Sequence, residues 1–158
     1  MKLFHSHIFL ICVLICTTTQ LVYAANLSTV IPLKDKGAST YYIDGVIEGY
    51  GNSEFMVDTG SGYTTINQDT LNILKAAGRA IYIKKLRGIL ADGTEKIVPV
   101  YRISKLQIGA TCEISNIEAA IFPGNTRHII GMNTLKKAGS FTFSFSPPTL
   151  TLGNCNPA

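Results

Sequence analysis

Most of the chain after residue 39 consists of short runs rich in aromatic and β-branched residues, a pattern typical of strands. The clearest run is residues 141–145, where three Phe side chains alternate with Thr142 and Ser144 and predict a half-buried strand. The predicted extended segments are residues 40–48, 54–57, 64–66, 80–90, 95–103, 105–108, 113–122, 141–145 and 149–152. The pattern therefore predicts a β-rich domain.

Two pairs of these segments are expected to form hairpins. A turn cluster at residues 49–52 separates the first two segments, so their hairpin delivers Asp58 at its end. Asp92-Gly93 separates the fourth and fifth segments, and an Asp-Gly pair between strands is a strong hairpin signal. Pro99 lacks a backbone donor, so we expect it at a sheet edge or a bulge.

Two helices interrupt the strand pattern. Residues 67–77 predict the longer one, because Asn67 can act as N-cap and Leu71 and Leu74 lie near helical spacing. A shorter helix is expected over residues 133–138.

Length and composition fit one globular domain. The 158 residues are too few for two domains of ordinary size. The composition, 46% hydrophobic and 15% charged residues, is typical of globular proteins. The formal net charge is +4, but the basic residues are scattered. Lys84, Lys85 and Arg87 form a small cluster that is better explained as a solvated strand face, so we expect no nucleic-acid partner.

The first 24 residues have the pattern of a secretory signal peptide. Lys2 provides the positive start, residues 9–15 form an apolar run, and polar residues 17–20 precede a cleavage site after Ala24. The apolar run is too short to span a membrane well, since a span needs about 20 apolar residues. We therefore expect an exported protein, periplasmic or secreted, with no stable membrane anchor once the signal is cleaved.

After cleavage, an N-terminal segment at residues 25–39 would precede the domain at residues 40–152 and a C-terminal tail at residues 153–158. The mature chain keeps Cys112 and Cys155. An even pair in an exported protein predicts a disulfide, which we expect within one chain, with an intermolecular bridge as the alternative.

Candidate chemistry lies at Asp58, which follows an apolar strand and opens the turn Asp58-Thr59-Gly60-Ser61. Peptide hydrolysis by carboxylates needs one group to accept a proton from water and another to donate a proton to the carbonyl oxygen. Two carboxyls about 3 Å apart share one proton, because like charges repel. The chain has only one Asp in such a context, so we expect a two-fold axis to bring in a second copy of Asp58.

The neighbours of Asp58 have expected roles in this turn. Gly60 allows a sharp turn and a close approach of the backbone to the carboxylate. The hydroxyl of Ser61 is expected to bond the outer oxygen of Asp58, and Thr59 is expected to hydrogen-bond across the axis.

Other chemistries find no support in the sequence. His128 is the only His after residue 24, too few for a metal site or a triad, and we expect a surface or structural role for it. Ser61 lacks a His base, and no zinc spacing, phosphate loop or dinucleotide fingerprint is present. We therefore expect no metal and no cofactor.

The order of these features resembles the retropepsin-like family of aspartic proteases, especially its single-domain exported or membrane-linked bacterial group. A strand leads to Asp-Thr-Gly-Ser, and a helix, an Asp-Gly hairpin and the run Ile129-Ile130-Gly131 follow in the family's order. The family's hairpin turn appears here as Leu-Ala-Asp-Gly at residues 90–93, and its Gly-Met-Asp-Phe-Leu-like run as Gly-Met-Asn-Thr-Leu at residues 131–135. The resemblance covers residues 41–152.

The resemblance implies an all-β acid-protease fold, a closed barrel or half-barrel of short strands with one or two short helices. The implied site residues are Asp58 as the catalytic carboxylate, Thr59, Gly60 and Ser61 in its loop, Ala91, Asp92 and Gly93 in a flap that closes over bound peptide, and Ile129, Ile130 and Gly131 as a supporting segment beneath the loop. Where the family has an acidic residue, Asn133 is expected to act as an N-cap.

By this resemblance we expect an aspartic endopeptidase that acts as a homodimer on extended peptides. A non-catalytic peptide-binding module on the same fold is the alternative, because a fold does not secure a function. A structural envelope protein is a third interpretation, and it would keep its role when Asp58 is replaced.

Overall fold

The computed structural model describes residues 28–155, so the predicted signal peptide at residues 1–24 lies outside the described residues. The elements in chain order are β1 (Thr29–Pro32), β2 (Lys34–Asp35), β3 (Tyr41–Ile47), β4 (Gly51–Val57), β5 (Thr64–Asn67), α1 (Gln68–Ala76), β6 (Ala80–Ile89), β7 (Glu95–Ile108), β8 (Cys112–Phe122), β9 (His128–Ile130), α2 (Met132–Lys137), β10 (Phe141–Phe145) and β11 (Pro148–Leu152). Each predicted extended segment overlaps a strand, and the two segments between residues 95 and 108 join in β7.

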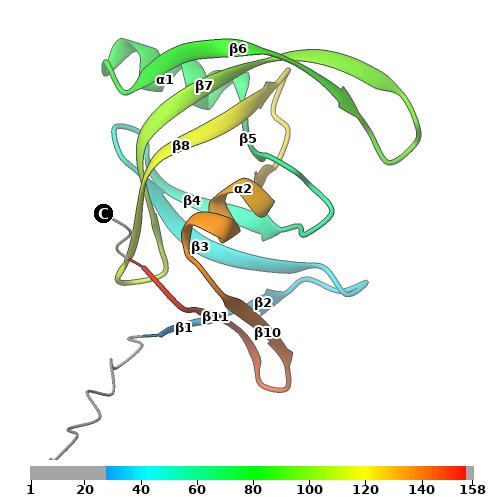
Figure 1. Cartoon of the computed structure of the whole chain (residues 1–158), viewed down its shortest axis with the longest axis vertical. Helices are drawn as coiled ribbons and strands as arrows, with labels where there is room; N and C mark the ends of the chain where they lie inside the picture. Colours follow the sequence, from blue (N-terminus) through cyan, green and yellow to red (C-terminus); the bar gives the residue numbers. More distant parts are fainter. Residues whose placement is uncertain (1–27, 156–158) are drawn as a thin grey trace, which may run out of the picture.

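Six strands close into a barrel, which confirms the all-β fold with two short helices. Their order is β3-β4-β9-β5-β8-β7, and β7 pairs back with β3 at Gly45↔Ile108 and Ile47↔Leu106. In Figure 1 the β6–β7 arm extends beyond the barrel and curves to a hairpin tip. Pairing between β7 and β8 begins only at Val100, so Pro99 lies where β7 is an edge strand on the β8 side, as expected.

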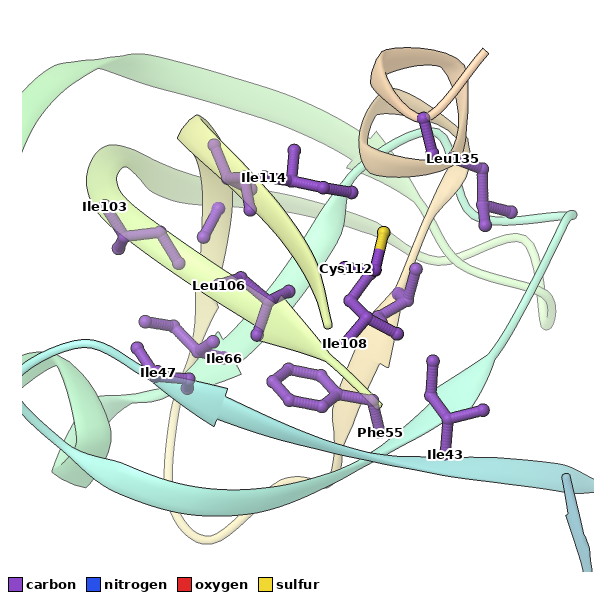
Figure 2. Close-up of a cluster of buried hydrophobic side chains, with 14 of the residues drawn as sticks. Ile43, Ile47, Phe55, Ile66, Ile103, Leu106, Ile108, Cys112, Ile114 and Leu135 are labelled. Carbon is purple, nitrogen blue, oxygen red and sulfur yellow. The ribbon is translucent and has the colours of Figure 1, made fainter. Parts of the chain in front are cut away.

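The barrel encloses the main hydrophobic core (Figure 2). Ile43 and Ile47 lie on one face of β3 and are fully buried, as are Phe55 on β4 and Leu106 on β7. Burial of such a side chain stabilises the fold by about 1.5–3 kcal/mol. Phe55 is buried three residues before Asp58, so the core anchors the strand that positions this carboxylate.

A smaller sheet in the order β1-β11-β10 packs against the barrel (Figure 1). The sequence does not predict β1 or β2, because segments of four and two residues are too short to show a period by themselves. β1 becomes a strand through its partner β11, as in the pair Ile31↔Leu150, and both of these side chains are buried. Part of the N-terminal segment therefore belongs to the folded domain.

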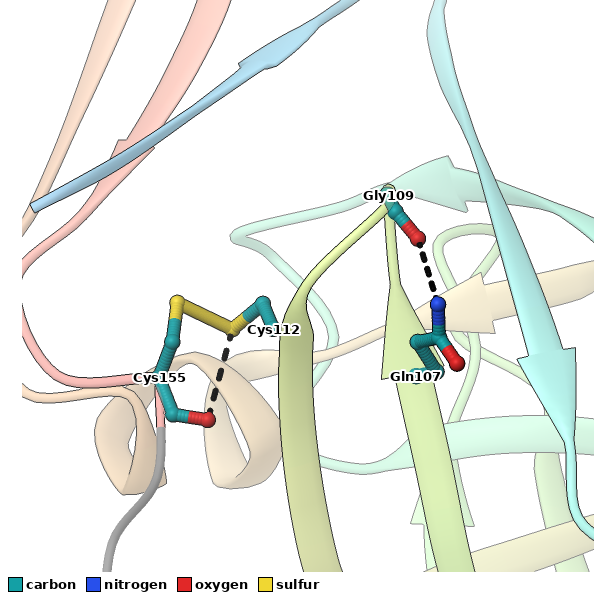
Figure 3. The surroundings of a disulfide bond; sticks show 4 residues. All are labelled: Gln107, Gly109, Cys112 and Cys155. Carbon is teal, nitrogen blue, oxygen red and sulfur yellow. Dashed lines mark hydrogen bonds between the residues drawn. A yellow bond between two sulfur atoms is a disulfide. The ribbon is translucent and has the colours of Figure 1, made fainter.

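Cys112 and Cys155 form a disulfide within the chain (Figure 3). Cys112 is the first residue of β8, Cys155 comes three residues after β11, and both are buried. Their Cα atoms are 4.5 Å apart, within the usual range for a disulfide. The bridge ties the end of the small sheet to the barrel.

The longer helix, α1, begins as the sequence predicts. The side chain of Asn67 accepts a hydrogen bond from the Thr70 amide at 2.9 Å, and this confirms its N-cap role. Leu71 and Leu74 are buried against the barrel. Neither helix in residues 28–155 has the length and apolar character needed to cross a membrane.

The shorter helix, α2, begins at Met132, one residue earlier than expected. Its N-cap is Gly131, and no side chain caps it. The N-cap role predicted for Asn133 is therefore wrong. Because Asn133 lies in the first turn of α2, its side chain is free to contact two neighbouring strands instead.

Candidate active site

Asp58 lies in the turn after β4 and is held by backbone groups. Its amide donates to the Ile130 carbonyl oxygen at 3.1 Å, and its carbonyl accepts from the Ser61 amide at 3.2 Å. The Gly60 amide donates to Asp58 Oδ1 at 2.9 Å, which is the close backbone approach expected of Gly60. Asp58 is half-buried, whereas Thr59 and Gly60 are exposed. The tip of the turn therefore faces solvent in a single chain.

The expected bond between Ser61 and Asp58 is wrong. Ser61 Oγ donates instead to the Tyr63 carbonyl oxygen at 2.7 Å. A hydroxyl has a single donor, and the carbonyl two residues along the chain takes it locally. Ser61 thus shapes the end of the loop without holding the carboxylate. The bond expected of Thr59 requires a second chain and stays a prediction.

The supporting segment runs beside the strand that carries Asp58. Ile129 and Ile130 belong to β9, which pairs in parallel with β4 at Met56↔Ile129 and Val57↔Ile130. Ile130 is fully buried and its carbonyl accepts the Asp58 amide. A core strand therefore anchors the first residue of the loop.

Gly131 lies directly against the far end of the same loop. A Cβ at this position would lie 2.3 Å from the Tyr63 carbonyl oxygen and 2.9 Å from that of Ser61. The next amide, Met132 N–H, donates to the Ser61 carbonyl at 2.8 Å. Only glycine fits between these backbone atoms, so Gly131 lets the start of α2 pack directly against the loop.

Three polar side chains join the loop to α2 and β8 through contacts that the sequence did not predict. Asn133 Oδ1 accepts from the Thr64 amide at 2.7 Å, and Asn133 Nδ2 donates to the Glu118 carbonyl at 2.6 Å. The Thr64 and Thr134 hydroxyls are 2.6 Å apart, and the Gly131 amide donates to Thr64 Oγ1 at 3.3 Å. Partners that are 15 to 70 residues apart leave no local signal in the sequence.

A cleft of about 1010 Å³ opens beside Asp58. The Asp58 loop forms one side, residues 86–91 of the β6–β7 arm form another, and parts of β8 and of the segment before β9 complete it. Its apolar wall includes Leu86, Val98 and Ala120, which pack together in a small second core. A mostly apolar cleft with a few polar groups is the usual form of a ligand site.

The predicted flap is the tip of the β6–β7 arm. Leu90 and Thr94 pair through a 2.8 Å backbone bond, and Gly93 takes the positive φ of 81° that this three-residue turn requires. Asp92 Oδ1 accepts from the amide and hydroxyl of Thr94, and these bonds lower the pKa of Asp92. Ala91 lines the cleft, whereas Asp92 and Gly93 build the turn.

Comparison with known proteins agrees with this geometry. A sequence profile of the family described as gag-polyprotein putative aspartyl protease matches residues 43–137, more than half of the chain. The chain belongs to this family.

A solved structure has a similar fold. The crystal structure of a retropepsin-like aspartic protease from Rickettsia conorii matches with a TM-score of 0.58 and 20% sequence identity, over 80% of this chain and 90% of that chain. At this identity the likeness supports the fold. No curated protein matches the chain.

Among residues 28–155 of this aspartyl protease family member, no three His, Cys, Asp or Glu side chains gather as a metal-binding group. Among the described residues that line the cleft, Asp58 is the one that carries a carboxylate.

His128 has a structural position behind the supporting segment. It is buried, with Ser53 Oγ 2.6 Å from Nδ1 and Thr70 Oγ1 3.0 Å from Nε2. The ring therefore connects β4, β9 and α1. Burial lowers the pKa of His128 below its ordinary value of 6.5, because a charged imidazole loses solvation there.

The lowered pKa of His128 predicts that the fold loses stability in mild acid. As the pH falls, the unfolded chain protonates this imidazole before the folded chain does. The contribution of neutral His128 to the free energy of unfolding is therefore complete above about pH 6.5 and is lost as the pH falls through the folded-state pKa. Urea unfolding of the mature chain at several pH values between 7 and 5 measures this decrease. His128→Gln, which can still bond both hydroxyls, is expected to remove most of it. If the free energy of unfolding has the same pH dependence in both proteins, His128 is not the cause of the decrease.

Proposed function

We propose that the protein is an aspartic endopeptidase that acts as a homodimer, in which each subunit supplies one Asp58. The observation that carries the proposal is the position of this carboxylate. Asp58 lines the cleft, is held by the Gly60 amide, and lies next to the exposed Thr59-Gly60 turn. Two such turns meeting at a two-fold axis would bring the two carboxylates together.

In the proposed reaction the two carboxyls share one proton. The ionised Asp58 accepts a proton from water as the water oxygen attacks the peptide carbonyl carbon, and the protonated Asp58 donates its proton to the carbonyl oxygen. The tetrahedral intermediate then breaks its C–N bond as the amine nitrogen takes the proton held by the first Asp58, and the second Asp58 takes back a hydroxyl proton from the intermediate, so that the pair again shares one proton. The bond from the Gly60 amide to Oδ1 fixes the position of each Asp58 carboxyl group.

The substrate proposed for this cleft is an extended peptide. The cleft runs between the loop and the β6–β7 arm, and the arm tip is stabilised mainly by its own hairpin bonds. Such an arm can close over a peptide and add backbone hydrogen bonds in the manner of a strand. We further propose that the protein acts in the periplasm or outside the cell, which the predicted signal peptide and the disulfide support.

Dependence of the cleavage rate on protein concentration tests the proposal. The mature chain, residues 25–158, is incubated with an unfolded protein at acidic pH, and its oligomeric state is measured by sedimentation under the same conditions. The initial rate is expected to rise more steeply than the protein concentration while monomers associate, and in proportion once the dimer is complete. Peptide binding without cleavage by a fully dimeric protein would favour the binding module instead.

A further inference from the structure

Arg127 places a positive charge on the wall of the cleft. It is the last residue before β9, it is exposed, and it lines the cleft together with Ile129. His128 between them is buried on the other face, as the alternation of a strand requires. The backbone therefore directs Arg127 and Ile129 to the same side as Asp58.

The guanidinium of Arg127 contacts only uncharged groups among the described residues. Nη1 donates to Tyr42 Oη at 3.2 Å and lies 3.6 Å from Met56 Sδ. Tyr42 and Met56 are opposite each other on β3 and β4, and Met56 is also opposite Ile129 on β9. These contacts hold the guanidinium against β3 and β4 beside the cleft and leave the N–H groups of Nε and Nη2 for a ligand.

The other cations around the cleft are already paired. Arg87 binds Glu95 through both Nε and Nη2, at 2.8 and 2.5 Å. Beyond Tyr42, Lys36 lies over the Tyr42 ring and pairs with Glu54. Arg127 is therefore the one cationic side chain among the described cleft residues that has no carboxylate within ion-pair distance.

The distance from Arg127 to Asp58 corresponds to a few residues of a bound peptide. Asp58 is bonded to Ile130, three residues after Arg127, and three residues of a strand span about 10 Å. An extended peptide in the cleft covers this length in about three residues. In the proposed dimer the two-fold axis repeats the arrangement on the other side of the scissile bond.

We propose that Arg127 makes the cleft selective for peptides that carry Asp or Glu within about three residues of the scissile bond. The proposal rests on the proposed function and adds a substrate class to it. A carboxylate can form two parallel hydrogen bonds with the fork of an arginine, which neither a neutral amide nor an apolar side chain can match.

The preference has a characteristic pH dependence. The charged groups near Arg127 are Asp58 across the cleft and the Lys36–Glu54 pair beyond Tyr42. A substrate Glu ordinarily ionises near pH 4.3, so the attraction to Arg127 is present above this pH and is lost below it. The ratio of acidic to neutral peptide cleavage should therefore fall as the pH is lowered through about 4.

Matched peptides test the proposal in the full mature protein. Each pair differs by Glu against Gln at one position within three residues of the cleaved bond, and kcat/KM is measured for both. The Glu peptide is expected to be preferred about fivefold or more for at least one position, mainly through KM. Arg127→Gln should bring this ratio to about one, and Arg127→Lys should restore part of it. Arg79→Gln is the control, because it removes an exposed cation that pairs with Glu48 and does not line the cleft. It should leave the ratio unchanged.

A binding measurement separates this proposal from the proposed function. The same peptide pairs, fluorescently labelled, are titrated with Asp58→Asn protein and with the double variant Asp58→Asn/Arg127→Gln. A preference for the Glu peptide that the second substitution removes supports the role of Arg127 even if the protein cleaves nothing. Equal binding of Glu and Gln peptides at every position, or a preference that survives loss of Arg127, overturns it.

Discussion

Replacement of Asp58 by Asn is expected to lower kcat for peptide cleavage by about 10³-fold or more. An amide cannot accept the proton of water or donate one as a carboxyl does, and general acid–base catalysis contributes about 10²–10⁴-fold for each group. In the proposed dimer one substitution removes both groups. The fold should persist, because the Gly60 amide can donate to the amide oxygen of Asn in the same way.

Asp44→Asn provides the matched control. Asp44 is an exposed carboxylate on β3 whose side chain pairs with Lys34 at 2.6 Å, away from the cleft. An exposed ion pair contributes little to stability, so this variant should keep wild-type activity and fold. Cleavage by Asp58→Asn protein at the rate of the Asp44→Asn control would contradict the mechanism.

Mixing wild-type and Asp58→Asn protein tests whether both copies of Asp58 are needed. When equal amounts of wild-type and Asp58→Asn protein exchange subunits freely, about half of the wild-type subunits acquire an inactive partner. The activity should then fall to about half of that of the wild type alone. An activity that the added variant leaves unchanged would indicate that each subunit works by itself.

Replacement of Gly131 by Ala is expected to lower the free energy of unfolding by about 4 kcal/mol, and activity with it. The added Cβ would meet the backbone of Tyr63 at 2.3 Å and that of Ser61 at 2.9 Å. Neither group is a flexible side-chain end, so the Asp58 loop must move away from β9 and α2. Chemical unfolding of the variant and of the wild type measures the loss.

Gly62→Ala is the control from the same loop. A Cβ on Gly62 would meet no atom within 4 Å, and this residue does not have the positive φ that favours glycine. Its stability should stay within about 1 kcal/mol of the wild type, or rise slightly as the unfolded chain becomes stiffer. Equal stability of the two variants would show that the contact at Gly131 is not as tight as the structure shows.

The sequence determined the features that depend on neighbouring residues. The Asp-Gly pair at residues 92 and 93 indicated the hairpin, Asn67 indicated the start of α1, and runs of aromatic and β-branched residues indicated most strands. Asp58-Thr59-Gly60-Ser61 and the later Ile-Ile-Gly run also pointed to the loop and its support. Turn chemistry, capping and strand period are local, so one chain is enough to read them.

Tertiary structure alone decided the contacts between distant segments. It assigned the Ser61 hydroxyl to Tyr63 and the Asn133 side chain to β5 and β8, where the sequence had suggested Asp58 and an N-cap. It also made β1 a strand through β11 and brought Arg127 into the cleft of Asp58. The physical reason is that a polar side chain binds whichever partner the folded backbone brings within about 3 Å, and sequence spacing does not encode that distance.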